Sequence, residues 1–287
     1  MPPSVLSMAD MPHTPFDLKL IPEAYQFLFR VSLFHDKEAG DRYADSVFPL
    51  RMFRAPSSVP RDPIPVPTQI PRGTGTNEEA WRGGLESLVA DSGAFWGGKG
   101  CAKMRAVDLY PIDIEGLLDC IPNVKQCGGD NRDAAYFSDY DASYTLQPEG
   151  NSSFLLVTGV NHNASGKATY ANVVVETAPQ DDGVFNATCN GRVGVDSNKF
   201  DGTAAAVAPD LADPDMYFAF AVSRDCDGLR ALAGDAAGLG CLELSADMVS
   251  GDDPLRVVTR AYLEKATATG PSYQELVWPV VSEFLCQ

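Results

Sequence analysis

From residue 135 onward, the apolar residues of this chain fall into short runs rich in β-branched and aromatic side chains. Gly, Asn, Asp and Pro bound these runs, which is typical of β-strands and their turns. The runs 153–160 and 168–175 are the clearest, and we expect them to form a hairpin with the tip 161–167. The full set of expected strands is 25–33, 46–53, 143–146, 153–160, 168–175, 184–189, 216–222 and 256–263.

The clearest helix is expected to begin near residue 76. Thr76 and Glu79 have the spacing of a capping box, and apolar residues follow Trp81 at positions i+4, i+7 and i+8. We expect this helix to end near residues 91–93, before a glycine-rich turn at 94–100.

Two further helices are predicted, and strands outnumber helices. One short helix is expected at 113–120, and another begins at the capping box Ser272/Glu275, where Pro279 would kink or split it. The strands do not alternate with helices, which disfavours a doubly wound parallel sheet. We therefore predict a mainly β fold, an antiparallel β-sandwich or open barrel with about three short helices; an α+β fold is the alternative.

A proline-rich segment divides the chain. Residues 55–72 contain six prolines, which cannot donate to a β-ladder and favour an extended connector. The predicted organisation is an N-terminal arm with strands at 1–54, a connector at 55–75 and a disulfide-compatible acidic β-rich domain at 76–287. The alternative is that the first and last parts form one compact unit.

The formal net charge of −17 excludes several classes of protein. A protein that grips nucleic acid or anionic lipid needs a surplus of cations, which this chain lacks. Its longest apolar stretches are shorter than the roughly 18–20 residues of a membrane span. Residues 130–253 hold 17 Asp and 3 Glu against 6 Lys and Arg, so −14 of the charge lies there. This predicts a solvated acidic face or, alternatively, calcium sites.

The cysteines favour disulfides over a metal site. Seven cysteines occur, none in the first hundred residues; no CxxC pair is present, and there are only three histidines. Plausible short bridges are Cys226–Cys241 or one within the group Cys101, Cys120 and Cys127. The odd count leaves one thiol unpaired, or paired with another chain or with a cysteine outside this chain.

Three glycosylation acceptors point to the same compartment. Asn151, Asn163 and Asn186 each begin an Asn-x-Ser/Thr sequence within 36 residues. With the cysteines, they predict an extracellular or secretory-pathway protein; the alternative is a reducing compartment with inert thiols. The N-terminus has neither the basic nor the apolar region of a signal peptide, so we expect a mature chain or a fragment that lacks one.

A few residues could support catalysis. His162 lies in the predicted hairpin tip, where it could act as a general base or simply supply turn geometry. Asp139 and Asp141 would share one face of an extended segment and could supply the acid and nucleophile of a glycosidase. Arg224 follows an apolar strand and could clamp a carboxylate.

One loop could bind calcium. Asp196, Asn198 and Asp201 offer oxygen ligands in 196–202, although the spacing fails the EF-hand pattern. A plain turn rich in Asp and Asn is the alternative. No other cofactor is expected.

The sequence therefore predicts an extracellular acidic β-rich glycoprotein that acts as a binding or structural module. Its partner would be a small molecule, a glycan or a protein, but not nucleic acid. The alternative is a secreted hydrolase of glycosides or esters that uses carboxylates with His162 or Arg224. A third reading is an assembly subunit that contacts a neighbour through its odd cysteine or proline-rich arm. Oligomeric state is not predicted.

Overall fold

The computed structural model divides the chain into two units, Met1–Thr68 and Gln69–Gln287. All described residues belong to the second unit. The described residues are 72–111, 133–138, 144–147, 153–177, 193–234, 236, 238–245, 254–267 and 269–287. The expected elements outside them are the strands 25–33, 46–53 and 184–189, the helix 113–120 and most of the proline-rich connector.

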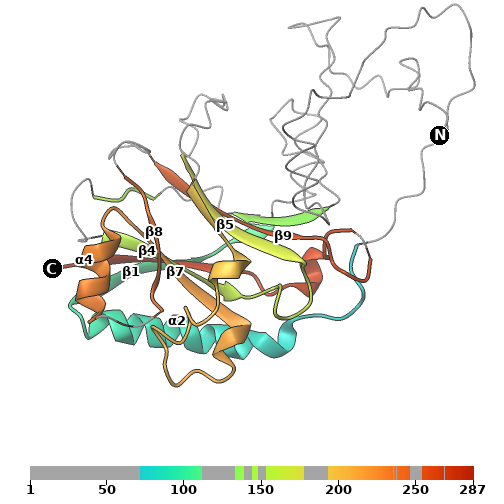
Figure 1. Ribbon diagram of the computed structural model, residues 1–287, viewed down its shortest axis with the longest axis horizontal. Coiled ribbons are helices and arrows are strands. Elements are labelled where there is room, and N and C mark those ends of the chain that lie inside the picture. The colour runs from blue at the N-terminus through green and yellow to red at the C-terminus, as the bar shows by residue number, and fades with distance from the viewer. Residues whose placement is uncertain are drawn as a thin grey trace, which may run out of the picture. The chain divides into compact units, whose positions relative to one another are not determined.

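Two five-stranded sheets pack together, as the predicted β-sandwich requires (Figure 1). The first, here called the helix-covered sheet, has the order β1 (Cys101–Asp108), β10 (Val280–Cys286), β4 (Ser153–Val160), β7 (Tyr217–Ser223) and β8 (Gly240–Glu243). The second sheet has the order β2 (Tyr110–Pro111), β3 (Ala134–Ser138), β9 (Leu255–Tyr262), β5 (Tyr170–Thr177) and β6 (Val193–Asp196). Every described neighbour pair is antiparallel except β7 with β8, and the described strands form no closed barrel.

Alternating residues of facing strands form the core between the sheets. In β9, Leu255, Val257 and Ala261 point into this core, where they meet aliphatic and aromatic side chains of the helix-covered sheet. Phe200 stacks on Phe218 of β7, with ring centroids 4.2 Å apart. The side chains of β9 that line the inner face of the sandwich therefore lie at alternate positions along the strand.

A second core lies on the opposite face of the helix-covered sheet. The helices α2 (Arg82–Gly97) and α4 (Cys226–Ala233) cover this face (Figure 1). Every residue of β4 and β7 is consequently buried, because both faces of these strands are covered. That double burial explains why their sequences are almost continuously apolar.

The helix α2 differs from the expected one at both ends. A 3-10 helix, η1 (Glu79–Trp81), precedes it, and Asn77 rather than Thr76 supplies the side-chain oxygen, which accepts from the Glu79 amide at 3.1 Å. The helix continues through residues 91–93 to Gly97, so the predicted end is wrong. Gly84 lets α2 approach β7, because a Cβ there would collide with the Tyr217 hydroxyl.

The predicted hairpin is wrong. β4 belongs to the helix-covered sheet and β5 to the second sheet, so residues 161–169 cross from one sheet to the other. β4 pairs with β10 and β7 instead. The apolar, β-branched runs located both strands but did not identify their partners, because each sheet has an apolar inner face.

The predicted C-terminal helix is also wrong. Only a single 3-10 turn forms, η4 (Tyr273–Glu275), and Ser272 makes no capping hydrogen bond. The chain then extends into β10, whose β-branched residues pair with β4 and with the edge strand β1. Strand β1 was not predicted, because six of its eight residues are exposed, as is common for an edge strand.

Two disulfides join elements of the helix-covered sheet. The predicted Cys226–Cys241 bridge is confirmed, and it ties α4 to β8. Helix α4 was not predicted; it forms the crossover that the parallel β7–β8 pair needs. Cys101 bonds to Cys286 rather than within the predicted group, because pairing of β1 with β10 places them opposite each other. Cys120, Cys127 and Cys189 lie outside the described residues.

The aromatic cluster beneath α2 supports a stability prediction. Phe154 of β4 is fully buried, stacks on Phe284 at 4.9 Å and contacts Trp96 at 4.6 Å between centroids. We expect Phe154→Ala to lower the free energy of unfolding by about 3–5 kcal/mol, because the cavity cannot close among rigid rings. Met104→Ala, at a 59 % exposed residue of β1, is the control and should change it by less than about 0.5 kcal/mol. If urea unfolding gave the same loss of stability for Phe154→Ala and Met104→Ala, the packing described for Phe154 would be contradicted.

Candidate functional site

Among the candidate residues that the structure describes, His162 and Arg224 do not lie at one site. Asp139 and Asp141 lie outside the described residues. Arg224 follows β7 and donates from Nη1 to the Leu244 carbonyl at 3.1 Å. His162 follows β4 next to the start of β7, since Val160 pairs with Tyr217. The seven residues of β7 therefore separate His162 from Arg224 by about 20 Å.

The proposed calcium loop forms a capped turn. The Asp196 carboxylate accepts from the Asn198 amide at 3.0 Å and so caps the 3-10 helix η2 (Ser197–Lys199). Asp201 is exposed in the turn that follows. Among the described residues, no group of three His, Cys, Asp or Glu side chains is placed to hold a metal ion. Calcium binding by this loop stays a prediction, because its described side chains do not form a set of metal ligands.

His162 is buried in a polar cluster rather than presented to solvent. Its Nδ1 lies 3.0 and 2.9 Å from the two carboxylate oxygens of Glu78, and only 4 % of its surface is exposed. The Ser165 hydroxyl and the Val277 amide also donate to Glu78. Burial alone would raise the pKa of the Glu78 carboxyl, but His162 and these donors outweigh it, so the pKa lies below its usual value.

A second set of buried charges adjoins this cluster. Lys167 Nζ lies 2.5 Å from both a Glu264 and a Glu275 oxygen and donates to the Thr76 carbonyl at 2.8 Å. Burial opposes the ammonium ion, but the two carboxylates outweigh it and raise the pKa of Lys167; Lys167 in turn helps to lower the pKa of Glu275.

We call these six residues the polar junction. Its members are Glu78, His162, Ser165, Lys167, Glu264 and Glu275. They join three segments: the stretch before α2, the crossover 161–169 and the stretch between β9 and β10. The His162 Nε2 atom is buried and has no hydrogen-bond partner among the described residues. A general base must reach its substrate, so this enclosed ring is placed to hold segments together.

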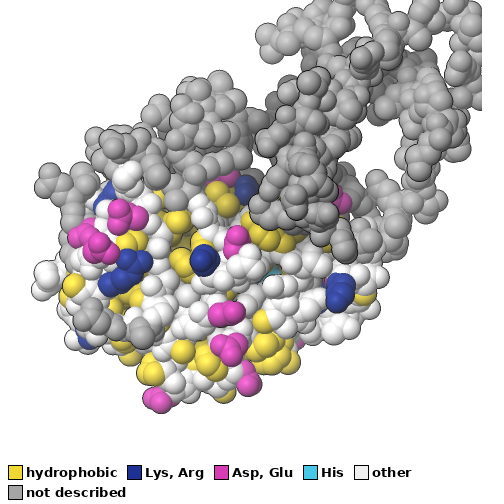
Figure 2. Space-filling model, viewed as in Figure 1, with side chains coloured by type: hydrophobic (Ala, Val, Ile, Leu, Met, Phe, Trp, Pro, Cys, Tyr) yellow, Lys and Arg dark blue, Asp and Glu magenta, His cyan; other side chains and the backbone are white. Residues whose placement is uncertain are grey.

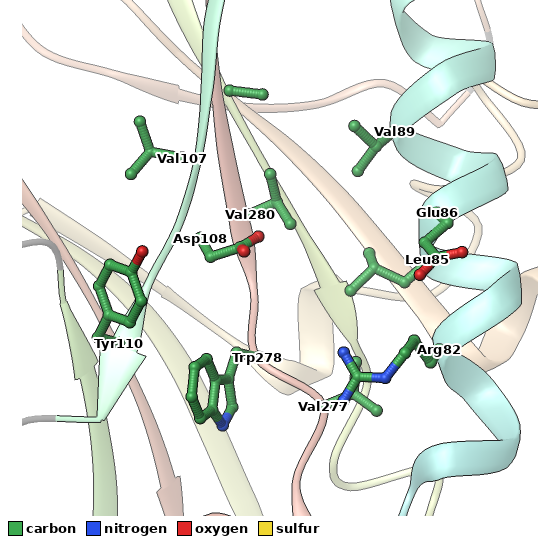
Figure 3. A pocket seen from close by; sticks show the side chains of 11 residues that line it. Arg82, Leu85, Glu86, Val89, Val107, Asp108, Tyr110, Val277, Trp278 and Val280 are labelled. Atoms are coloured by element: carbon green, nitrogen blue, oxygen red, sulfur yellow. The ribbon is translucent and has the colours of Figure 1, made fainter.

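An open groove lies between α2 and the β1–β10 edge of the sheet. Its volume is about 480 Å³, and Figure 3 shows side chains of α2 on one wall and of β1 on the other. Tyr110 and Trp278 stand together at its rim, with ring centroids 5.9 Å apart and planes at 67°. They are 54 % and 37 % exposed. A backbone hydrogen bond of 2.8 Å from Leu109 to the Pro279 carbonyl holds their two segments side by side.

Three charged side chains face this groove. Arg82 and Glu86 come from α2, and Asp108 comes from β1 (Figure 3). The Arg82 Nε donates to Glu79 at 2.7 Å; this bond is the main reason that the pKa of Arg82 is raised, with Glu86 and Asp108 adding to it. Neither the Glu86 nor the Asp108 carboxylate makes a hydrogen bond to a described residue.

Sequence reasoning missed this groove. Its aromatic residues are far apart in the chain and only the fold brings them together. One signal was available: Tyr110 and Trp278 each precede a proline, which favours an extended backbone at both positions. Glu78 and Lys167 carried no local signal at all.

Comparison with known protein families, with curated proteins and with solved structures finds no significant match to this chain.

Figure 2 shows acidic and hydrophobic side chains interspersed over the lower part of the face where α2 lies. Within the described ranges, no helix has the length and apolar character needed to cross a membrane.

The polar junction predicts how stability depends on pH. Because the pKa of Glu78 is lowered in the folded state, its contribution is present above the unfolded pKa, near 4.5, and is lost as pH falls through the folded pKa. We expect Glu78→Gln to cost about 3 kcal/mol at pH 7, and this cost to shrink below about pH 4.5. Urea unfolding between pH 3 and 7 measures both effects.

Glu79→Gln is the matched control for that experiment. Glu79 is the neighbouring carboxylate, and it lies exposed beside Arg82, where an ion pair adds little stability. If both variants had the same stability at pH 7, Glu78 would not have the buried role described above.

Proposed function

We propose that this chain is an extracellular binding module that holds its ligand in the groove between α2, β1 and β10. The observation that carries the proposal is the exposed Tyr110–Trp278 pair beside carboxylates that have no hydrogen-bond partner among the described residues. Large aromatic rings are normally buried, and a concave site with a few convergent polar groups is the usual form of a ligand site.

The two disulfides support the proposed extracellular location. Cys101–Cys286 and Cys226–Cys241 indicate an oxidising environment. Asn163 is exposed, whereas the adjacent His162 is buried, so a glycan on Asn163 would not displace the junction. An exposed acceptor in a disulfide-bonded domain fits a secreted glycoprotein.

The hydrolase alternative has no comparable support among the described residues. His162 is enclosed, and Arg224 lies about 20 Å away along β7. We therefore favour binding over catalysis.

Mass spectrometry of protein secreted from a eukaryotic host tests the proposed extracellular location. We expect both disulfides and a glycan on Asn163. Asn163→Gln should remove that glycan and leave stability unchanged. Ser165→Ala should also remove it, but should lower stability because Ser165 donates to Glu78. Free thiols at all four bonded cysteines, with an unmodified Asn163, would contradict an extracellular location.

A thermal-shift screen tests the groove. The probes are neutral saccharides, acidic saccharides, choline, amino acids and nucleotides, because a ligand that binds only the folded protein raises its melting temperature. We expect at least one probe to stabilise the wild type but not Trp278→Ala. Met104→Ala, outside the groove, should respond as the wild type does. Shifts that survive Trp278→Ala, or no shift with any probe, would overturn the groove as the binding site.

A further inference from the structure

The exposed surface of Trp278 is apolar and flat. The polar atom of its ring, Nε1, donates to the Tyr273 carbonyl at 3.4 Å within the protein. What remains for a ligand is therefore the ring itself, with Tyr110 beside it (Figure 3). Such a surface suits a ligand face made of C–H groups.

The polar groups of the groove include both acceptors and donors. Glu86 and Asp108 are carboxylates with open acceptor positions, and Arg82 uses only Nε for its bond to Glu79, which leaves its terminal N–H groups. In Figure 3, Arg82 and Asp108 reach into the groove from α2 and β1, and Trp278 lies beside them. A ligand here needs groups that donate and groups that accept, next to an apolar face.

These demands disfavour several ligand classes. An anion would face two carboxylates and a protein of net charge −17. A cation would be attracted by the two carboxylates, but it would be repelled by the Arg82 guanidinium and would offer no acceptor to the Arg82 N–H groups. A wholly apolar molecule would bury the charged groups without hydrogen bonds, which costs free energy.

We propose that the groove binds a neutral pyranose oligosaccharide, with one sugar ring stacked on Trp278. Its hydroxyls donate to Asp108 and Glu86 and accept from Arg82, while its C–H face covers the indole. β-Linked glucose units fit best, because all their ring hydroxyls are equatorial and leave both faces apolar. This inference rests on the proposed function, namely that the groove is the ligand site.

Titration of the full chain with cellotetraose and laminaritetraose tests the inference. We expect calorimetry to show binding, and Trp278→Ala to weaken it at least tenfold. Trp278→Phe retains a flat ring and should lose less. Asp108→Asn keeps the shape but weakens the acceptor, and should also reduce affinity; Met104→Ala should not. Far-ultraviolet circular dichroism and the midpoint of urea unfolding confirm that each variant is folded.

The contradicting outcomes separate the two proposals. If neither neutral oligosaccharide binds at millimolar concentration, but choline or the acidic tetragalacturonate binds in a Trp278-dependent way, the inference of a neutral saccharide fails and the groove remains the ligand site. If an oligosaccharide binds equally well to Trp278→Ala and Asp108→Asn, both proposals fail. If no probe binds, both fail as well.

Discussion

The buried Glu78 carboxylate is the interaction on which the arrangement of this domain depends. An ionised carboxylate is costly to remove from water unless its oxygens are paired and hydrogen-bonded. Here His162 and Ser165 from the crossover and the Val277 amide from the stretch before β10 satisfy it. The backbone amide of Glu78 also donates a hydrogen bond to the Glu275 carbonyl at 2.8 Å. One side chain therefore fixes three segments that are far apart in the sequence.

This constraint extends to the groove. Helix α2 begins four residues after Glu78, so the wall that carries Arg82 starts at the polar junction. The opposite aromatic rim is set in the same way, because Trp278 directly follows Val277. Lys167 adds a second link between these segments through its ion pair with Glu275. The Glu275 carboxylate also accepts hydrogen bonds from the Thr74 and Gly75 amides. We infer that the junction determines the spacing of the two walls without contacting a ligand.

The sequence predicted this fold class because β4 and β7 are buried on both faces, which makes their apolar runs unmistakable. It did not predict the partners of β4, because pairing across two sheets is a nonlocal choice. The Ser272/Glu275 spacing imitated a capping box, but the fold uses Glu275 to pair with Lys167. Local patterns thus located the long strands β4, β5, β7 and β9 but missed the short and edge strands, and they assigned polar residues poorly.

The same distinction applies to the candidate site. His162 was recognised as unusual from its position, yet its role depends on Glu78, which lies 84 residues earlier. Trp278 was assigned to a helix, and its exposure follows only from the extended segment that precedes β10. Each of these functions needs groups from separate segments, and no spacing rule within one segment reveals them.

Hydrogen exchange in Glu78→Gln, followed by mass spectrometry, tests most directly whether the junction positions the groove. The account predicts faster exchange confined to residues 74–86, 161–169 and 275–278, with β4 and β7 still protected. Unchanged exchange at the start of α2 and around Trp278, or a uniform increase over the whole domain, would contradict it.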